Sequence, residues 1–367
     1  MQIIVNFAQR IKMNYTVHKA KQIYLIFLTG VLFAACTRNK KVDVSNIPID
    51  VHIERFDRDF DAMRTKPMAP QAAYLQNKYG PFYNDFIDLM LQTKNSKDSA
   101  YFATLRQVFT NREHNRNAYA DLKHEVDSVY PGSLDKQNAE LTDAFRRIKY
   151  YYPKAILPVK VYAYFSGFQA QTSIGNNYFG IGLDMFLGAN SKFYPALTEL
   201  FPHYVSRRFT PDYIAPRVAE TIIRENLFPE NDNDKSLLAK MVYNGKIMYF
   251  MDEVLPDVPD SVKIGYTDKQ LKWANDFKAD IWAYFLDQNL LYETDFNRIQ
   301  MYLTEAPFTP GLGDKNDSAP KLGIWTGWQI VKQYMSKHPQ TTIAQLMAID
   351  DAQKILNESK YRPGKGD

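Results

Sequence analysis

Residues 159–165 read Val-Lys-Val-Tyr-Ala-Tyr-Phe, and residues 178–184 read Tyr-Phe-Gly-Ile-Gly-Leu-Asp. The first run alternates apolar and more polar side chains with a period of two, which is the period of a β-strand. A stretch containing Gly, Ser and Asn separates the two runs, so we expect them to form paired strands. Residues 49–54 alternate in the same way, which predicts a half-buried strand with His52 exposed.

Before and after these strands, apolar residues recur at the spacing of a helix. A capping-box start at Thr267 and Gln270 precedes a helix that we expect to reach Phe285. A long Pro/Gly loop is expected over 306–321. Further helices are expected at Phe82 to Met90, at Leu134 to Ile148 (ending before Pro153), at 235–254, and around 324–337 and 342–357. The fold class predicted is therefore α+β: a mostly helical single domain with a small β-sheet over residues 48–367.

The composition and charge exclude several classes of protein. The chain has 367 residues, of which 45% are hydrophobic and 14% aromatic, with a single cysteine. These values exclude a disordered tail and a disulfide scaffold. The net charge of +4 comes from the first 35 residues, which carry four basic residues and no acidic one, so the remainder is neutral. A neutral body argues against nucleic acid as a partner, and no glycine fingerprint for a nucleotide is present.

The N-terminus has the features of a targeting segment. Residues 23–35 form an apolar run of 13 behind two lysines, which is too short to span a membrane and typical of a signal peptide. The run ends in Leu-Phe-Ala-Ala before Cys36, which resembles a bacterial lipobox. We therefore predict a lipoprotein signal peptide over 1–35, lipid attachment at Cys36, and a tether over 36–47 that anchors the protein to a membrane.

Sequence patterns for catalysis are weak in this chain. No two histidines stand at i and i+4, and the nearest imitation of a zinc-peptidase helix, at His124, has Ser128 in place of the second histidine. Ser166 precedes a glycine but lacks the other glycine of a nucleophile turn, so we interpret it as an ordinary turn. Acidic and aromatic side chains are too numerous to mark a glycosidase cleft. The sequence predicts no metal and no cofactor.

Several short strings in order resemble one family. They are Gly182–Gly188, Phe201–Tyr204, Gly245–Phe250, Ile264–Thr267, Pro307–Pro310, Gly327–Val331 and Ser359–Pro363. Behind a lipobox, this set resembles the GldB-type gliding-motility lipoproteins of Bacteroidetes, over about Ile49 to Pro363. The resemblance implies a role in the gliding motility and type IX secretion apparatus, with other envelope proteins of that machinery as partners. Lipoproteins of that phylum sent to the cell surface carry acidic residues after the cysteine. Here Arg38, Lys40 and Lys41 follow, so we expect a periplasm-facing protein on the outer or the inner membrane.

The resemblance also extends to predicted zinc peptidases, which implies a zincin-like body. Laid on that pattern, Ala219 and Ile223 stand where two histidine ligands would be, and Asn244 where a glutamate ligand would be. Only Glu220, at the position of the general base, is kept. At helical spacing Glu220 is expected to pair with Arg224 as an exposed ion pair.

These features favour a lipid-anchored, non-catalytic component of the motility or secretion machinery, whose peptidase-like body serves protein interaction. The alternative is an envelope hydrolase, either a metallopeptidase with unrecognised ligands or an enzyme acting on glycans, and a glycan-binding module is a third class. Trp325 and Trp328 lie three residues apart on one helical face. They are interpreted either as core anchors or as a docking edge for a protein partner.

Overall fold

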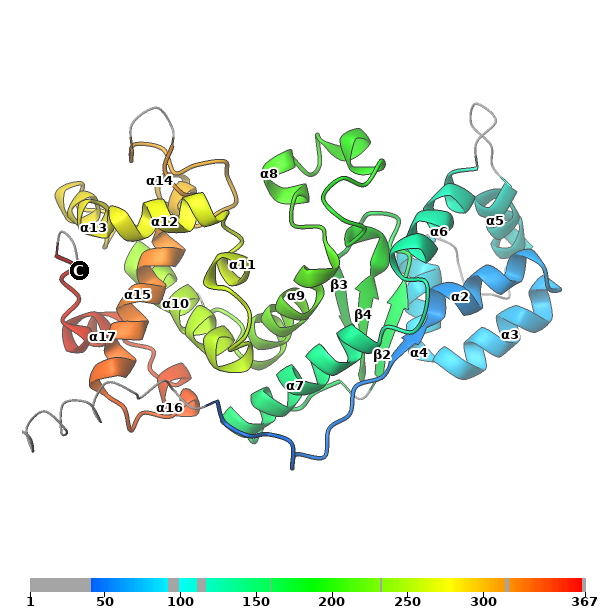
Figure 1. The fold of residues 1–367 in the computed structure, drawn as a ribbon, viewed down its shortest axis with the longest axis horizontal. Coiled ribbons are helices and arrows are strands. Elements are labelled where there is room, and N and C mark those ends of the chain that lie inside the picture. Colours follow the sequence, from blue (N-terminus) through cyan, green and yellow to red (C-terminus); the bar gives the residue numbers. More distant parts are fainter. Residues whose placement is uncertain are drawn as a thin grey trace, which may run out of the picture. The chain divides into compact units, whose positions relative to one another are not determined.

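The computed structural model describes residues 41–91, 99–110, 117–158, 160–231, 233–313 and 317–364, and Val44–Asp367 forms one compact unit. This unit is mostly helical and holds one four-stranded mixed sheet (Figure 1). The prediction of a mostly helical single domain with a small sheet is confirmed. Cys36 and the segments assigned to the signal peptide and most of the tether lie outside the described residues, so those assignments stay predictions, as does the zincin likeness.

The sheet contains the two strands expected from the opening pattern. Its strands are β1 (Ile53–Arg55), β2 (Lys160–Tyr164), β3 (Thr172–Gly175) and β4 (Tyr178–Gly182), in the spatial order β1-β2-β4-β3. β2 lies parallel to both β1 and β4, with Val161 opposite Ile53 and Phe179. The pairing of the two predicted strands is confirmed. β3, which the sequence analysis did not identify, runs antiparallel to β4 and joins it through a tight turn in which Asn177 has a φ of 65°.

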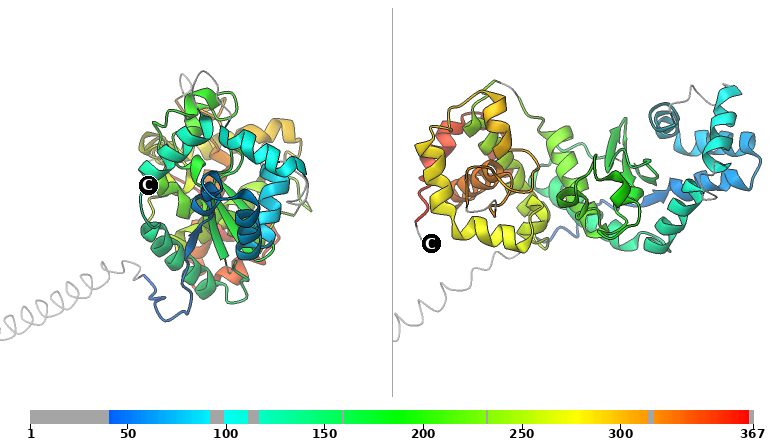
Figure 2. Two further views of the ribbon diagram at one scale, coloured as in Figure 1. Left: turned by 90° about the vertical axis from the view of Figure 1, so that its right-hand side faces the viewer. Right: turned by 90° about the horizontal axis from the view of Figure 1, so that it is seen from above.

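Helices cover both faces of the sheet. Figure 2 shows helices on both sides of the sheet. Val161 and Phe179 contribute to a core shared with α6 (Ala118–Val129), α7 (Asp135–Tyr151), α9 (Ile214–Thr221) and α10 (Leu237–Val254). Tyr162 and Tyr178 contribute to a second core shared with α2 (Phe56–Asp61), α3 (Met68–Tyr79), α4 (Pro81–Asp85) and α5 (Ser99–Thr110). The tyrosines that alternate with the apolar residues of β2 are therefore buried as well, because a second set of helices covers their side. Phe56 and Phe82 are central to this aromatic core and lie edge to face with their ring centroids 4.9 Å apart.

The segment before β1 is held by a helix instead of a strand. Three side chains of α7 (Asp135–Tyr151), spaced four residues apart, bond to alternate residues of the segment 49–53. The Arg146 side chain donates to the carbonyl of residue 49, Thr142 accepts from the amide of residue 51, and Asn138 accepts from that of residue 53. Regular strand pairing consequently begins at Ile53, four residues later than predicted from the alternation. His52 is exposed, as expected.

Helices α2 to α6 follow β1, and the helix predicted at Phe82 to Met90 corresponds to one of them and to the π-helical turn after it. They are α2 (Phe56–Asp61), α3 (Met68–Tyr79), α4 (Pro81–Asp85), α5 (Ser99–Thr110) and α6 (Ala118–Val129). Phe82 and Phe86 are buried as predicted, but Leu89 is 66% exposed. A π-helical turn over Phe86–Met90 widens the backbone there and rotates Leu89 out of the predicted face.

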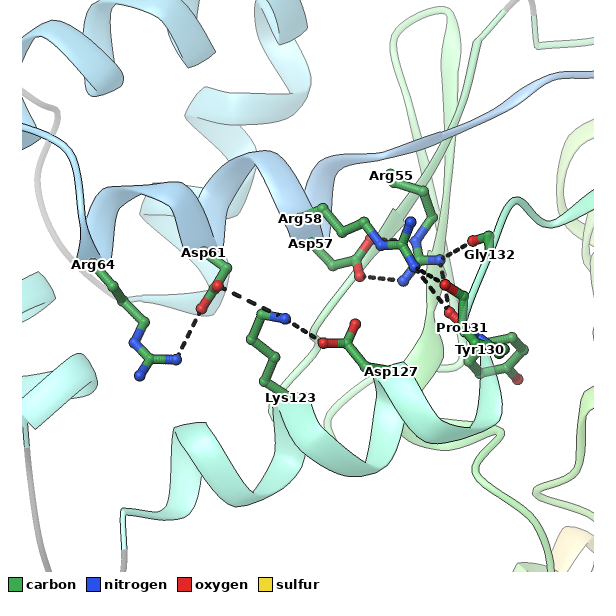
Figure 3. A network of polar contacts seen from close by, with 10 residues as sticks. All are labelled: Arg55, Asp57, Arg58, Asp61, Arg64, Lys123, Asp127, Tyr130, Pro131 and Gly132. Atoms are coloured by element: carbon green, nitrogen blue, oxygen red, sulfur yellow. Dashed lines mark hydrogen bonds and ion pairs between the residues drawn. The ribbon is translucent and has the colours of Figure 1, made fainter.

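An extended polar network joins α2 to the end of α6 (Figure 3). The Arg55 guanidinium donates two hydrogen bonds, of 2.8 and 2.7 Å, to the Asp57 carboxylate. It also donates to the Gly132 carbonyl at 2.9 Å. Arg58 donates to the carbonyls of Tyr130 and Pro131 at 3.1 and 3.0 Å. The two arginines thus bind carbonyl groups beyond the C-terminal end of α6, where a helix favours positive charge, and this network serves packing.

The C-terminal half is helical and ends in a third core. Its helices are α8 (His203–Ser206), α9 (Ile214–Thr221, continued by a π-helical turn over Ile222–Leu227), α10 (Leu237–Val254), α11 (Asp260–Ile264), α12 (Asp268–Asp276), α13 (Lys278–Asp287), α14 (Phe296–Ile299), α15 (Leu322–Lys337), α16 (Ile343–Met347) and α17 (Ala352–Ser359). The capping box at Thr267 is confirmed. The helix predicted to run from there to Phe285 is divided at Phe277, and the last predicted helix is divided into α16 and α17.

Two buried tryptophans anchor α15 in the third core. The side chains of Trp325 and Trp328 are 1% and 0% exposed. The indole of Trp328 donates to Asp252 at 2.8 Å, and the Lys332 ammonium lies 3.8 Å above its ring. The structure therefore places both tryptophans as core anchors, since neither ring is presented at a surface where a partner could dock. Among the residues that the structure describes, no helix combines the length and the apolar character needed to cross a membrane.

Candidate functional site

A cavity of about 280 Å³ opens beside α9 and combines charged with apolar walls. Its charged lining residues are Arg208, Arg217, Glu220, Arg224, Lys263, Glu305 and Lys321. Its apolar walls include Phe209, Met248 and Ile324. The lining residues are spread over more than 100 positions of the sequence, so only the folded chain brings them together.

Glu220 occupies the α9 side of this cavity between two arginines. Arg217, three residues before, lies 3.3 Å from one carboxylate oxygen, and Arg224, four residues after, lies 3.2 Å from the other. The predicted pair with Arg224 is confirmed, but its setting is a concave pocket and the Glu220 side chain is only 27% exposed. Burial acts to raise the pKa of Glu220, and the positive charges of Arg224, Arg217 and Lys321 outweigh it, so the pKa lies below its usual value.

Arg224 also links Glu220 to Asn244, two positions that the sequence resemblance matched to functional groups of zinc peptidases. Its second guanidinium nitrogen donates to the side-chain oxygen of Asn244 on α10 at 3.0 Å. The amide nitrogen of Asn244 donates in turn to the Lys240 carbonyl at 2.8 Å. Both ends of the Asn244 side chain are thus hydrogen-bonded within the protein, and Arg224 bridges Asn244 to Glu220.

The opposite wall of the cavity carries the second carboxylate, Glu305. Arg208 lies 3.1 Å from it, and the Lys321 ammonium donates both to Glu305 and to the Ile264 carbonyl. Burial acts to raise the pKa of Glu305, but Lys321 and Arg208 hold it below the usual value. Lys321 has the left-handed backbone conformation, with a φ of 51°, which is uncommon for a residue with a side chain.

A glycine allows Arg208 to reach this position. Gly265 has a φ of 78°, and a Cβ atom placed on it would lie 2.1 Å from a guanidinium nitrogen of Arg208. The carbonyl of the same residue accepts a hydrogen bond of 2.5 Å from Arg207. Gly265 therefore both provides the turn after α11 and leaves space for the arginine in the cavity wall.

The two positions aligned with zinc-binding histidines do not face this cavity. Ala219 and Ile223 are fully buried in the core that α9 shares with the sheet. Within the described ranges, no group of three or more His, Cys, Asp or Glu side chains is arranged to hold a metal ion. Of the aligned positions, only Glu220 lines the cavity, and it is bound to arginines.

The chemistry available in the cavity is that of charge pairing. A carboxyl group that donates a proton near neutral pH needs a raised pKa. Glu220 and Glu305 both have lowered pKa values and hydrogen-bond to cations. The arrangement suits the binding of an anion better than proton transfer.

The other sequence motifs are structural or exposed. Ser166 is buried, and Asp184 accepts hydrogen bonds from its amide at 2.8 Å, from its hydroxyl at 3.0 Å and from the Phe168 amide at 2.6 Å. These bonds hold a bend after β2 in which Gly167 and Phe168 have φ values of 65° and 60°, so the segment is more constrained than the ordinary turn that was expected. His124 is exposed on α6.

The sequence predicted the pair of Glu220 with Arg224, but as an exposed ion pair and with no cavity around it. The helical spacing of Arg217, Glu220 and Arg224 is visible in the sequence because it is local. Arg208 and Glu305 are 97 residues apart, and no spacing rule connects them. Gly265 lies beside Arg208 in the fold, but in the sequence it is part of the segment Ile264–Thr267, which was used only for the family resemblance.

Comparison with known proteins gives one family. The family model described as "Gliding motility protein GldB" matches residues 37–363. No curated protein and no solved structure matches this chain.

Proposed function

Because this chain belongs to the GldB family of gliding motility proteins, we propose that it is a lipid-anchored, non-catalytic component of the gliding motility or type IX secretion machinery of the cell envelope. In this role the domain from residue 48 onward binds other envelope proteins, and the lipid on Cys36 holds it at the periplasmic side of the outer or the inner membrane.

The absence of catalysis is proposed because of the side chains at the three positions that the resemblance to zinc peptidases matched with metal ligands. Catalytic zinc sites have three protein ligands and a bound water. Ala219 and Ile223 have no donor atom and lie in the core, and Arg224 engages the side-chain oxygen of Asn244. Glu220 has no metal-bound water to act on in such an arrangement.

A glycan hydrolase is the less favoured alternative. That chemistry needs one carboxyl group that stays protonated as the acid and one that stays ionised. The two carboxylates of the cavity, Glu220 and Glu305, are both held in the ionised form by neighbouring cations. This electrostatic setting supports a binding role instead.

Metal analysis and an activity assay test the proposal directly. The full chain, purified from its own envelope without added metal, is expected to contain far less than one zinc per chain and to cleave neither peptides nor peptidoglycan. Near-stoichiometric zinc, lost on chelation together with a hydrolytic activity, would contradict the non-catalytic assignment.

A crosslinking experiment tests the assignment to the machinery. The tagged lipoprotein is crosslinked in intact cells and compared with a Cys36→Ala chain expressed at the same level. Known motility or secretion components should be recovered with the lipidated chain and be depleted with the variant. If neither motility components nor secretion components are recovered with the lipidated chain, a role in that apparatus is contradicted.

A further inference from the structure

We propose that the cavity beside α9 is a binding site for a phosphate-type dianion, with Arg208, Arg217, Arg224 and Lys321 as its cationic wall. This inference does not depend on the proposed function, because it rests on the charge and hydrogen bonding of the cavity alone.

The charge balance of the cavity favours an anion with two negative charges. Its fifth cation, Lys263, is already paired with Asp252 at 2.7 Å and Asp260 at 3.0 Å. The four remaining cations face two carboxylates, Glu220 and Glu305. The wall therefore keeps an excess of two positive charges in a concave site, where they are less screened by solvent than on an open surface.

The arginines of the same wall favour the same kind of ligand. The Nε–H groups of Arg208 and Arg217 are buried and have no hydrogen-bond partner among the described residues. A buried donor without an acceptor is costly, and such groups in folded proteins usually have a partner. Guanidinium groups bind phosphate oxygens with several parallel hydrogen bonds, and the wall of this cavity carries three of them, on Arg208, Arg217 and Arg224.

The apolar part of the lining defines what is attached to the phosphate. Phe209, Met248 and Ile324 line the cavity together with the cations. A volume of about 280 Å³ exceeds the needs of a bare phosphate and leaves room for an apolar substituent. A phosphate monoester, either a small soluble metabolite or a lipid headgroup, shares the chemistry that this site recognises.

Calorimetric titration of the full chain in detergent with inorganic phosphate tests the site, at constant ionic strength set with sodium chloride. Arg217→Gln is expected to weaken phosphate binding about tenfold, which is the loss of one charge-assisted hydrogen bond. Arg64→Gln is the matched control. Arg64 is 37% exposed and lies 3.3 Å from an acidic residue three positions away, as Arg217 is 38% exposed and lies 3.3 Å from Glu220.

A second variant gives a change of opposite sign and guards against an effect of misfolding. Glu220→Gln removes a negative charge from the wall, so it is expected to tighten phosphate binding several-fold while Arg217→Gln weakens it. Absence of phosphate binding in the unmodified chain overturns the proposal. Equal affinities in Arg217→Gln, Glu220→Gln and Arg64→Gln also overturn it, because bound phosphate would then lie elsewhere.

Competition distinguishes the two sources of the phosphate group. Glycerol 3-phosphate and phosphatidic acid, each in the same detergent, are titrated against bound inorganic phosphate. Stronger displacement by phosphatidic acid assigns the site to a lipid headgroup, and displacement by glycerol 3-phosphate at equal or lower concentration assigns it to a soluble ester. Failure of both to displace phosphate would overturn the monoester assignment.

Discussion

Gly245 of α10 lies directly against Gly327 of α15: a Cβ atom on Gly245 would be 2.3 Å from the Gly327 carbonyl oxygen, closer than any real contact allows. The relationship is reciprocal, since a Cβ on Gly327 would be 1.8 Å from the carbonyl oxygen of Met241. The two helices therefore cross with their backbones in contact. This crossing joins α10, which borders the cavity, to the helix that holds the buried tryptophans.

The first prediction concerns this crossing. Gly327→Ala places a methyl group on the α10 backbone, which cannot move aside as a side chain can, so the helices must separate. We expect the free energy of unfolding to fall by about 3 kcal/mol or more, measured by urea denaturation. Gly132→Ala is the control, because a Cβ there meets nothing within 4 Å. Equal denaturation midpoints for both variants would show that the helices do not cross so closely.

A second prediction concerns Trp328. Trp328→Ala removes a fully buried ring and the hydrogen bond to Asp252. The free energy of unfolding should therefore fall by about 3–5 kcal/mol. The partly buried Trp282 serves as comparison, and its replacement by Ala should cost less. A Trp328→Ala chain of unchanged stability that loses its partner proteins would instead support the docking-edge interpretation.

The third prediction concerns the pH dependence of stability at Glu220. The cations around it lower its pKa in the folded chain below the ordinary value of 4.5. A lowered folded pKa contributes stability above the unfolded pKa, and this contribution is lost as the pH falls through the folded pKa. Glu220→Gln should therefore reduce the free energy of unfolding by about 1 kcal/mol at pH 7 and by less below pH 4 to 5.

The exposed Glu225, five residues later, provides the control for that experiment. Glu225→Gln should leave stability nearly unchanged at neutral pH, as substitutions of exposed residues usually do. An effect of Glu220→Gln that grows toward acid pH would have the wrong sign for a carboxylate held by cations.

The fourth prediction concerns the contact between α7 and the segment before β1. Thr142→Val keeps the shape of the side chain but leaves the buried amide of Val51 without its acceptor at 2.9 Å. The expected loss in free energy of unfolding is about 1–3 kcal/mol. Thr304→Val removes an exposed hydroxyl that bonds a carbonyl of its own turn and should cost much less. Similar losses for the two variants would argue against a special role of the α7 contact.

The fifth prediction concerns the anchor. Cys36→Ala should yield an unprocessed or soluble periplasmic chain, because the apolar run of 13 residues is too short to span a membrane stably. Fractionation after a high-salt wash and labelling with palmitate measure the result. A variant that stays in the membrane fraction and still carries label would refute lipidation at this residue.

Local features of the sequence were predictive, and long-range ones were not. The capping box at Thr267 and the pairing of Glu220 with Arg224 depend on residues three or four positions apart, and both were confirmed. The bond from Arg224 to Asn244 spans two helices, so no periodicity could indicate it. The late start of β1 has the same cause, because the partner of residues 49–53 is a helix about 90 positions away, which alternation alone does not reveal.

The same segment determines how the domain would bear a mechanical load. With lipid at Cys36, tension from the membrane would reach the compact unit at the buried Val44 and pass along the chain into residues 49–53. The bonds from Asn138, Thr142 and Arg146 run across this extended segment, so a pull along it strains all three at once instead of breaking them in turn. β1 continues the segment and pairs in parallel with β2, which extends the sheared contact into the sheet. The attachment is therefore built to resist force along the tether, while a pull at right angles would peel it open bond by bond.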